Sequence, residues 1–149
     1  MTSSNDVIHA TSGNTVSKAS WYYFLAGQTF ICACRPNNCS MTNTNRTYFV
    51  NKSNRLIGKP YTALCQMSYS VINDGSKIEP SQITALRCDG VVEYVYEYYG
   101  YRVGGGNTDW DISLNLTSNF SAHYGYLVTP AMQNTYLLIR VTTVQSSLY

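Results

Sequence analysis

The clearest pattern of apolar and polar residues lies between residues 88 and 100. Its apolar positions recur at the spacing of one helical face: Val91, Val92, Val95 and Tyr99. This spacing predicts a helix with one buried face. Glu93 and Glu97 lie four residues apart on another face, and Gly100 suits the end of the helix because glycine adopts the left-handed conformation easily.

Strand patterns occur near both ends of the chain. Residues 6–10 predict a short strand, and after a turn at 12–14 the chain resumes an extended form at 15–16. The run 29–34 is continuously apolar, which predicts a central strand buried on both faces. Residues 136–144 are rich in β-branched and aliphatic side chains and predict another strand.

Shorter elements are expected between these strands. A helix over 21–26 is expected, with Ser17 or Ser20 as its cap. Residues 40–54 are polar and weakly periodic, which predicts a loop that leads into a helix ending near 57–58.

The remaining segments complete a single domain. Residues 65–72 predict extended structure, and 80–86 predict a short helical or extended segment before the helix at 88–100. Helices and strands intermix, and no repeat or linker divides the 149 residues. The sequence therefore predicts one α+β domain.

The low charge of the chain and its lack of a long apolar run argue against a nucleic-acid partner and a membrane span. Only 12% of the residues are charged, the net charge is +2, and no basic patch is visible, so we expect no nucleic-acid partner. No apolar run approaches the roughly 20 residues that cross a bilayer, so we expect no membrane span. The first residues lack the basic and apolar regions of a signal peptide, so none is expected on this chain.

The cysteines give no metal site by their spacing. They are Cys32, Cys34, Cys39, Cys65 and Cys88. An odd number leaves at least one thiol outside a disulfide. The first three have no nearby histidine and do not match the common zinc spacings, so packing or a single disulfide is the favoured interpretation. We expect no metal and no other cofactor.

Cys88 stands at the start of the predicted helix. Unpaired backbone N–H groups and the helix dipole favour negative charge there, and the thiolate is the reactive form of cysteine. A buried structural cysteine is the alternative, because free cysteines are often buried. Its position makes Cys88 the candidate nucleophile.

The residues around Cys88 resemble a known motif. Residues 87–97, Arg-Cys-Asp-Gly-Val-Val-Glu-Tyr-Val-Tyr-Glu, are similar to the nucleophile helix of the NlpC-type, papain-like cysteine peptidases and amidases, Asp-Cys-Ser-Gly-(apolar)-Val-x-Tyr-Val-Tyr. Three further segments match in the order of the permuted branch, which includes the lecithin:retinol acyltransferase relatives. They are Val-Ile-His-Ala at 7–10, a Gly-x-x-Val turn at 13–16, and a Gly-x-Pro-Tyr element at 58–61. The resemblance implies a papain-like fold in which an antiparallel sheet packs against the helix that carries Cys88.

A thiolate nucleophile needs a base, and the chain has only His9 and His123. The resemblance gives His9 the place of a second polar group of the site. In the permuted branch the strand that carries the base would lie before residue 1. The alternatives are therefore a domain that lacks its first strand, His123 as the base in a segment similar to His-x-Gly-x-Tyr, or an inactive relative. Without the resemblance, His9 is interpreted as a hydrogen-bonded histidine at a strand end and His123 as a surface loop histidine.

Two more residues follow from the resemblance. Tyr61 matches the tyrosine of the Gly-x-Pro-Tyr element and would line the site and donate to the oxyanion. Asp89 replaces the small residue that usually follows the nucleophile, and a carboxylate there would disfavour the thiolate.

The resemblance implies a thiol-dependent amidase or peptidase that acts through an acyl-enzyme on cell-wall peptide or a related amide. The partner would then be a peptide or peptidoglycan-like substrate, outside the cytoplasm of a bacterium. The alternative is a catalytically inactive relative that binds carbohydrate or peptide. Without a first strand, the edge at 7–10 would be exposed and would favour self-association.

Overall fold

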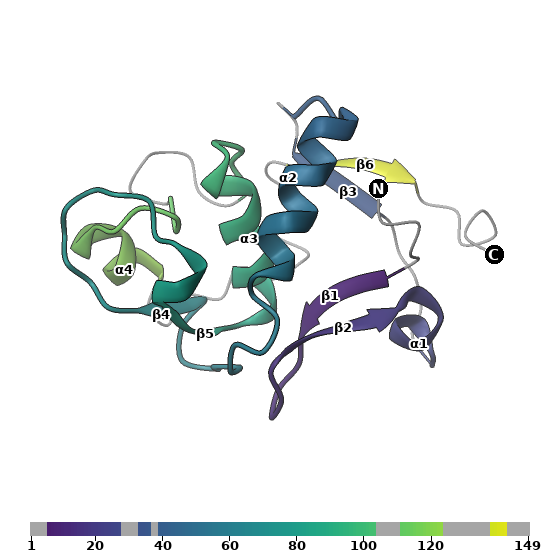
Figure 1. Ribbon diagram of the computed structural model, residues 1–149, viewed down its shortest axis with the longest axis horizontal. Helices are drawn as coiled ribbons and strands as arrows, with labels where there is room; N and C mark the ends of the chain where they lie inside the picture. The colour runs from purple at the N-terminus through teal and green to yellow at the C-terminus, as the bar shows by residue number, and fades with distance from the viewer. Residues whose placement is uncertain (1–5, 28–32, 37–38, 104–110, 124–137, 143–149) are drawn as a thin grey trace.

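The computed structural model describes residues 6–27, 33–36, 39–103, 111–123 and 138–142, which form a mixed arrangement of helices and small antiparallel sheets (Figure 1). In chain order the elements are β1 (Asp6–Ala10), β2 (Val16–Ser20), α1 (Trp21–Leu25), β3 (Ala33–Pro36), α2 (Asn43–Asn54), β4 (Met67–Tyr69), a 3-10 turn (Pro80–Gln82), β5 (Ile83–Leu86), α3 (Cys88–Tyr98), α4 (Thr117–His123) and β6 (Leu138–Thr142). The structure confirms the prediction that helices and antiparallel strands are mixed in this chain.

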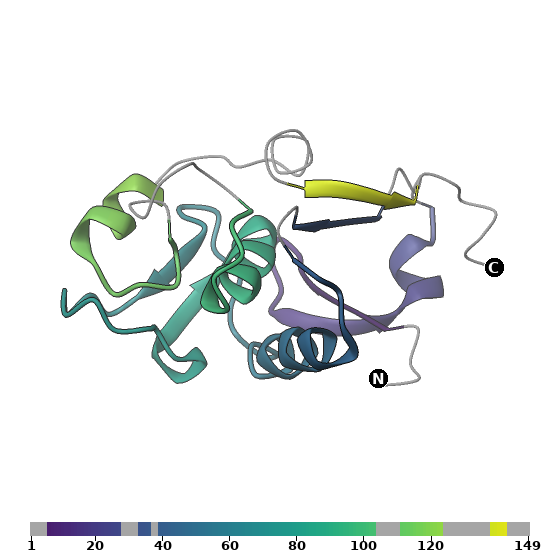
Figure 2. The same cartoon turned by 90° about the horizontal axis from the view of Figure 1, so that it is seen from above.

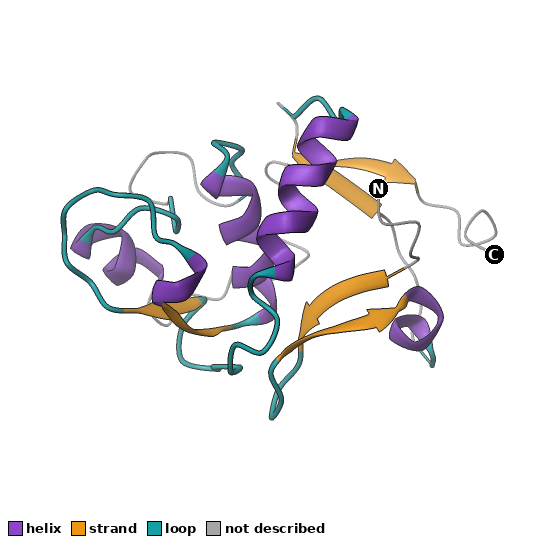
Figure 3. Cartoon of the chain, viewed as in Figure 1, coloured by secondary structure: helices purple, strands orange, loops and turns teal. Residues whose placement is uncertain are grey.

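Within the described residues the strands form separate antiparallel pairs, β1 with β2, β3 with β6 and β4 with β5 (Figure 3). The hairpin of β1 and β2 runs in register from Asp6 opposite Ser20 to Ala10 opposite Val16. Val16 N also donates to Lys59 O at 2.7 Å. Because Tyr61 bridges to Leu86, the hairpin is linked through residues 58–61 to the strand that leads into α3.

Helix α3 stands in the middle of the molecule (Figures 1 and 2). The hairpin β1–β2 lies on one side of it, and α4 with β4 and β5 lies on the other. Helix α2 packs along α3, and β1 also contacts α3. The helix that carries Cys88 therefore joins the two halves of the core.

Helix α3 is buried on two faces rather than one. Val91 and Val95 are buried, as the apolar spacing predicts, but Val92 is 37% exposed. Glu93 and Glu97, which the sequence placed on another face, are 0% and 1% exposed. The expectation of a single buried face is therefore wrong, because α4 and the segment near Ile112 cover the side that carries the glutamates.

A very close contact fixes the start of α3. A Cβ atom added to Gly90 would lie 1.9 Å from the carbonyl oxygen of Gln66, a separation that real atoms do not reach. The same oxygen accepts a hydrogen bond of 2.9 Å from Arg87 N. The first turn of α3 therefore lies directly against the backbone of residue 66, and only glycine fits at position 90.

Helix α2 differs from its prediction because its sequence is polar. The sequence predicts a loop that leads into a helix ending near 57–58, whereas α2 already begins at Asn43 and ends at Asn54. Thr42 caps it by accepting from Asn45 N at 3.2 Å. Only Phe49 and Lys52 of this helix are buried. Lys52 Nζ lies 3.2 Å from the centre of the Tyr98 ring. The cap and the aromatic contacts stabilise this helix. Because few of its residues are apolar, its sequence shows little of the periodicity that predicts a helix.

Other expectations have mixed outcomes. Strand β1, helix α1 with Ser20 as its cap, and β6 within 136–144 are confirmed. The central strand expected over 29–34 falls largely outside the described residues. Its described part, β3, ends later than expected, at Pro36, and Cys34 is half-buried rather than buried. No described helix has the length and apolar character needed to cross a membrane.

Replacing Gly90 with alanine should destabilise the protein by about 3 kcal/mol, because overpacking against backbone outweighs the gain in helix propensity. The matched control is Gly100→Ala at the other end of α3, where the glycine has a positive φ of 83° and no atom blocks a Cβ. It should cost only about 1 kcal/mol. Urea unfolding measures both, and equal losses would contradict the close contact at Gly90.

Candidate functional site

Cys88 is the first residue of α3 and is exposed. Its two neighbours are buried, Arg87 with 5% and Asp89 with 3% of its surface exposed. The chain therefore turns into the helix with one side chain directed outward between two that are directed inward. This placement gives the thiol both solvent access and the field of the helix N-terminus.

The neighbours of Cys88 form a buried ion pair. Arg87 Nε and Nη2 donate to the two carboxylate oxygens of Asp89 at 2.7 and 2.8 Å, and Gln66 Nε2 donates to Asp89 Oδ2 at 3.0 Å. The hydrogen bond to Asp89 is the main cause of the raised pKa of Arg87, and the nearby Cys88 and Tyr61 add to it. Asp89 is therefore not an unpaired anion beside the thiolate, which removes the main reason to doubt the reactivity of Cys88.

A groove of about 230 Å³ lies between the hairpin, α2 and α3. Its lining comes from Val91, Val92, Val95 and Tyr96 of α3, from Phe49, Val50, Ser53 and Asn54 of α2, and from Asp6, Ile8 and Lys18 of the hairpin. Residues three and four apart share one face of a helix. Cys88 is therefore on the groove face of α3, one turn before Val91 and Val92.

His9 lies on β1 and is half-buried. Its Nδ1 is 2.9 Å from Thr11 Oγ1, and its Nε2 is 3.3 Å from Ser17 Oγ. The ring packs against Phe24 with 5.3 Å between centroids. Strand alternation places His9 on the opposite face of β1 from Ile8, which lines the groove. β1 itself contacts α3, so His9 is on an element beside the Cys88 helix, but its described hydrogen bonds are within the hairpin.

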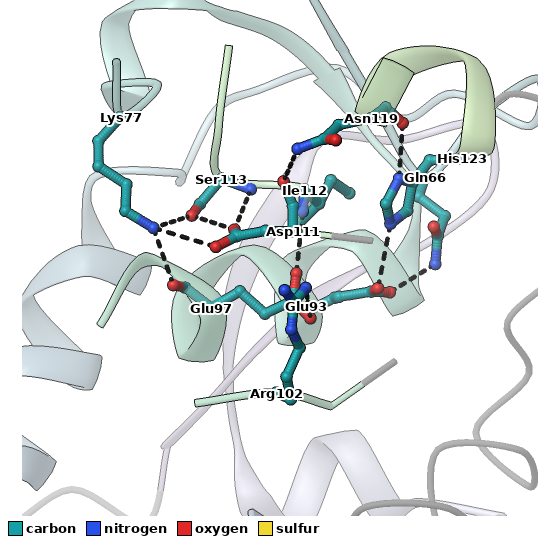
Figure 4. A network of polar contacts seen from close by, with 10 residues as sticks. All are labelled: Gln66, Lys77, Glu93, Glu97, Arg102, Asp111, Ile112, Ser113, Asn119 and His123. Carbon is teal, nitrogen blue, oxygen red and sulfur yellow. Dashed lines mark hydrogen bonds and ion pairs between the residues drawn. The ribbon is translucent and has the colours of Figure 1, made fainter. Parts of the chain in front are cut away.

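His123 ends helix α4 and is 3% exposed. Its Nδ1 is 2.7 Å from Asn119 O, and its Nε2 is 3.3 Å from Glu93 Oε1 (Figure 4). The interpretation as a surface loop histidine is wrong, as is the strand that the His-x-Gly-x-Tyr likeness suggested at this residue. At 100° per residue, Glu93 projects about 140° around α3 from Cys88. His123 therefore contacts the face of α3 away from the groove.

Tyr61 is half-buried and lies where its backbone bridges to Leu86, two residues before Cys88. Tyr61 and Cys88 both contribute to the raised pKa of Arg87. The structure thus places Tyr61 on a segment that bridges to the strand leading into α3. It holds His123 on the other side of the helix.

A buried polar network lies along the second face of α3, and the sequence patterns did not predict it (Figure 4). Gln66 Nε2 donates to Glu93 Oε2 at 2.6 Å as well as to Asp89. One turn later, Glu97 accepts from Ile112 N at 2.9 Å and lies 3.4 Å from Arg102 Nη1. Glutamates four residues apart are typical of a solvent-exposed helix face. Their burial could be inferred only from the apolar residues of the segments that cover them.

Burial is the main cause that raises the pKa of Glu97, to about 9, and the nearby Glu93 carboxylate adds to it. Glu97 is therefore protonated at neutral pH in the folded protein. This carboxyl belongs to the interior of the domain and not to the groove.

No protein-family model, curated protein or solved structure matches this chain. Within the described ranges, no group of three or more His, Cys, Asp or Glu side chains is arranged to hold a metal ion. Cys39, Cys65 and Cys88 form no disulfide.

Asp89→Asn removes the carboxylate that pairs with Arg87 and so makes the electrostatic potential beside Cys88 more positive. An anionic reagent is then attracted to the thiol, whereas a neutral reagent is not. We expect the ratio of the iodoacetate to the iodoacetamide rate at Cys88 to rise severalfold, measured by mass spectrometry. The double variant with Arg87→Met should restore the ratio, and an unchanged ratio in Asp89→Asn would contradict the charge balance at this site.

Stability should fall as pH rises from about 5 to 9 because of Glu97. The unfolded chain releases this proton near the ordinary value of 4.5, whereas the folded protein keeps it up to about pH 9. Folding therefore takes up a proton between these values, and raising the pH opposes it. Glu97→Gln should flatten the dependence in urea unfolding at pH 5, 7 and 9, a change on the order of several kcal/mol. Asp74→Asn is the control, because its hydrogen bonds to Ser76 lower the pKa of Asp74, which keeps its titration below this range.

Proposed function

We propose that this chain is a thiol-dependent amidase or peptidase with a papain-like, NlpC-type fold. Cys88 attacks an amide of a cell-wall peptide or a related substrate and forms an acyl-enzyme. The observation that carries the proposal is the exposed thiol on the first turn of α3, on the face that also forms the groove. The hairpin that precedes the nucleophile helix in the chain supports the permuted branch of that fold.

The reaction follows from the position of the thiol. Cys88 Sγ bonds to the amide carbonyl carbon, and the amine leaves with a proton supplied by the base. Water then hydrolyses the thioester and releases the acid. The backbone N–H of Cys88 and the hydroxyl of Tyr61 are the candidate donors to the oxyanion.

We assign His9 rather than His123 to this site because of its element alone, since the His9 ring lies on the face of β1 opposite the groove. His9 lies on β1, which contacts α3, and its ring is oriented by the hydroxyls of Thr11 and Ser17. Both ring nitrogens of His123 are engaged with Asn119 and Glu93 on the far face of α3. A base upstream of residue 1 stays an alternative to His9.

A binding domain without catalysis is the second candidate function. It is favoured by the described hydrogen bonds of both histidines, which do not include Cys88. In this function the groove would hold peptide or carbohydrate and the thiol would have no role. Cleavage of an amide and its dependence on Cys88 separate the two candidates.

Cys88 should be more reactive than Cys39 and Cys65. Cys39 and Cys65 are buried, and burial is the main cause that raises the pKa of each. With iodoacetamide at pH 8, mapped by mass spectrometry, we expect Cys88 to react at least about tenfold faster than these two. An inert Cys88 in the folded protein would remove the nucleophile from this proposal.

The same variants test turnover on cell-wall muropeptides. Cys88→Ala should abolish amide cleavage, and His9→Ala should lower the rate by about 10²–10⁴ while Cys88 still alkylates. His123→Ala is the matched control, because it should lower stability more than the rate per folded molecule. Binding of muropeptides with no cleavage by the unaltered chain would favour the binding domain.

A further inference from the structure

The groove beside Cys88 is lined by apolar residues together with four polar ones, Asp6, Lys18, Ser53 and Asn54. Val91, Val92 and Val95 of α3 face Ile8 of β1 and Phe49 of α2 across it. Its volume is about 230 Å³. An apolar cavity of roughly 150 Å³ is enough to bind benzene. The groove therefore has room for one bulky side chain and little more.

The charges that line the groove cancel each other. Lys18 Nζ lies 2.8 Å from Asp6 Oδ2, and both residues belong to the lining. A charged group that entered would lose water without meeting an opposite charge, which is costly. The groove is therefore complementary to an uncharged occupant.

We propose, on the basis of the nucleophilic role assigned to Cys88 above, that this groove is the specificity pocket for an uncharged aliphatic or aromatic side chain of a peptide substrate. Val92 is the residue that determines the preference. It is 37% exposed, and it lies one helical turn, about 6 Å along the axis, after Cys88. A side chain held against Val92 places the neighbouring amide within reach of the thiol.

Two features favour a peptide over a lipid as the occupant. The volume suits one side chain rather than an extended acyl chain. The strand β1 borders the groove and, within the described residues, pairs with β2 alone, so an extended peptide has a strand edge on which to align. The peptide main chain and one of its side chains would then be held by adjacent surfaces.

The test uses acetyl-aminoacyl chloromethyl ketones that carry leucine, phenylalanine, glycine, lysine or glutamate. The measured quantity is the rate of labelling at Cys88 of the full chain, divided by its rate with iodoacetamide. We expect the leucyl and phenylalanyl reagents to react at least about tenfold faster than the other three, which corresponds to roughly 1.4 kcal/mol. Equal rates for all five would overturn the pocket.

Three variants locate the preference. Val92→Trp should fill the groove and bring the ratio of leucyl to glycyl rates close to one. Ile72→Trp is the matched control, since Ile72 is 60% exposed and is not among the lining residues, and it should leave the ratio unchanged. Lys18→Met removes a positive charge from the lining beside Asp6, so the lysyl reagent should gain severalfold over the glutamyl reagent. A leucyl preference that survives Val92→Trp would overturn the assignment.

Failure of the pocket and failure of the nucleophile give different results. If iodoacetamide does not label Cys88, the proposed function fails. The groove is then tested in Cys88→Ala, where acetyl-leucine methylamide should shift the methyl NMR signals of Val91, Val92 and Val95 and acetyl-lysine methylamide should not. If iodoacetamide labels Cys88 but a dodecyl iodoacetamide labels it faster than the leucyl reagent, a lipid chain is the occupant and the peptide pocket is overturned.

Discussion

The contact between the first turn of α3 and the backbone of Gln66 is the constraint on which the rest of the structure depends. Gly90 permits the contact, and the carbonyl of Gln66 receives the N–H of Arg87. The side chain of Gln66 then binds both Asp89 and Glu93. One residue thus anchors the start of the helix through its backbone and the next turn through its amide.

This anchor explains why the two sides of α3 differ in chemistry. The side toward residue 66 and α4 carries buried carboxyl groups, which form hydrogen bonds with an amide, an arginine and a backbone N–H group. The side toward α2 and the hairpin carries valines and borders the groove. Cys88 lies on the groove side at the start of the helix. Its neighbours Arg87 and Asp89 form a buried ion pair, while its own side chain is exposed.

The sequence predicted those elements that are specified by residues close to them in the chain. The hairpin strand at 6–10, the Ser20 cap of α1 and the start of α3 depend on turn residues, a hydroxyl and a short apolar pattern. The bounds of helix α2 were not predicted because its buried residues include Lys52, which packs against Tyr98 and adds no apolar position to the pattern. The burial of Glu97 was not predicted because the backbone N–H of Ile112, which donates to it, reaches α3 only through the tertiary structure. Of the site, Cys88 and Tyr61 could be placed from motifs, whereas the orientation of the histidines depends on packing that no motif encodes.

The anchoring of α3 on Gln66 also has a consequence for the order in which the molecule assembles. Residue 66 precedes the helix by more than twenty positions, so the native first turn requires a loop to close before the helix is fixed. Until that closure, Cys88 is a thiol on an open chain, without an aligned helix terminus or a groove beside it. The chemical environment of the thiol is therefore acquired with the tertiary fold. A nascent or partly unfolded chain does not carry it.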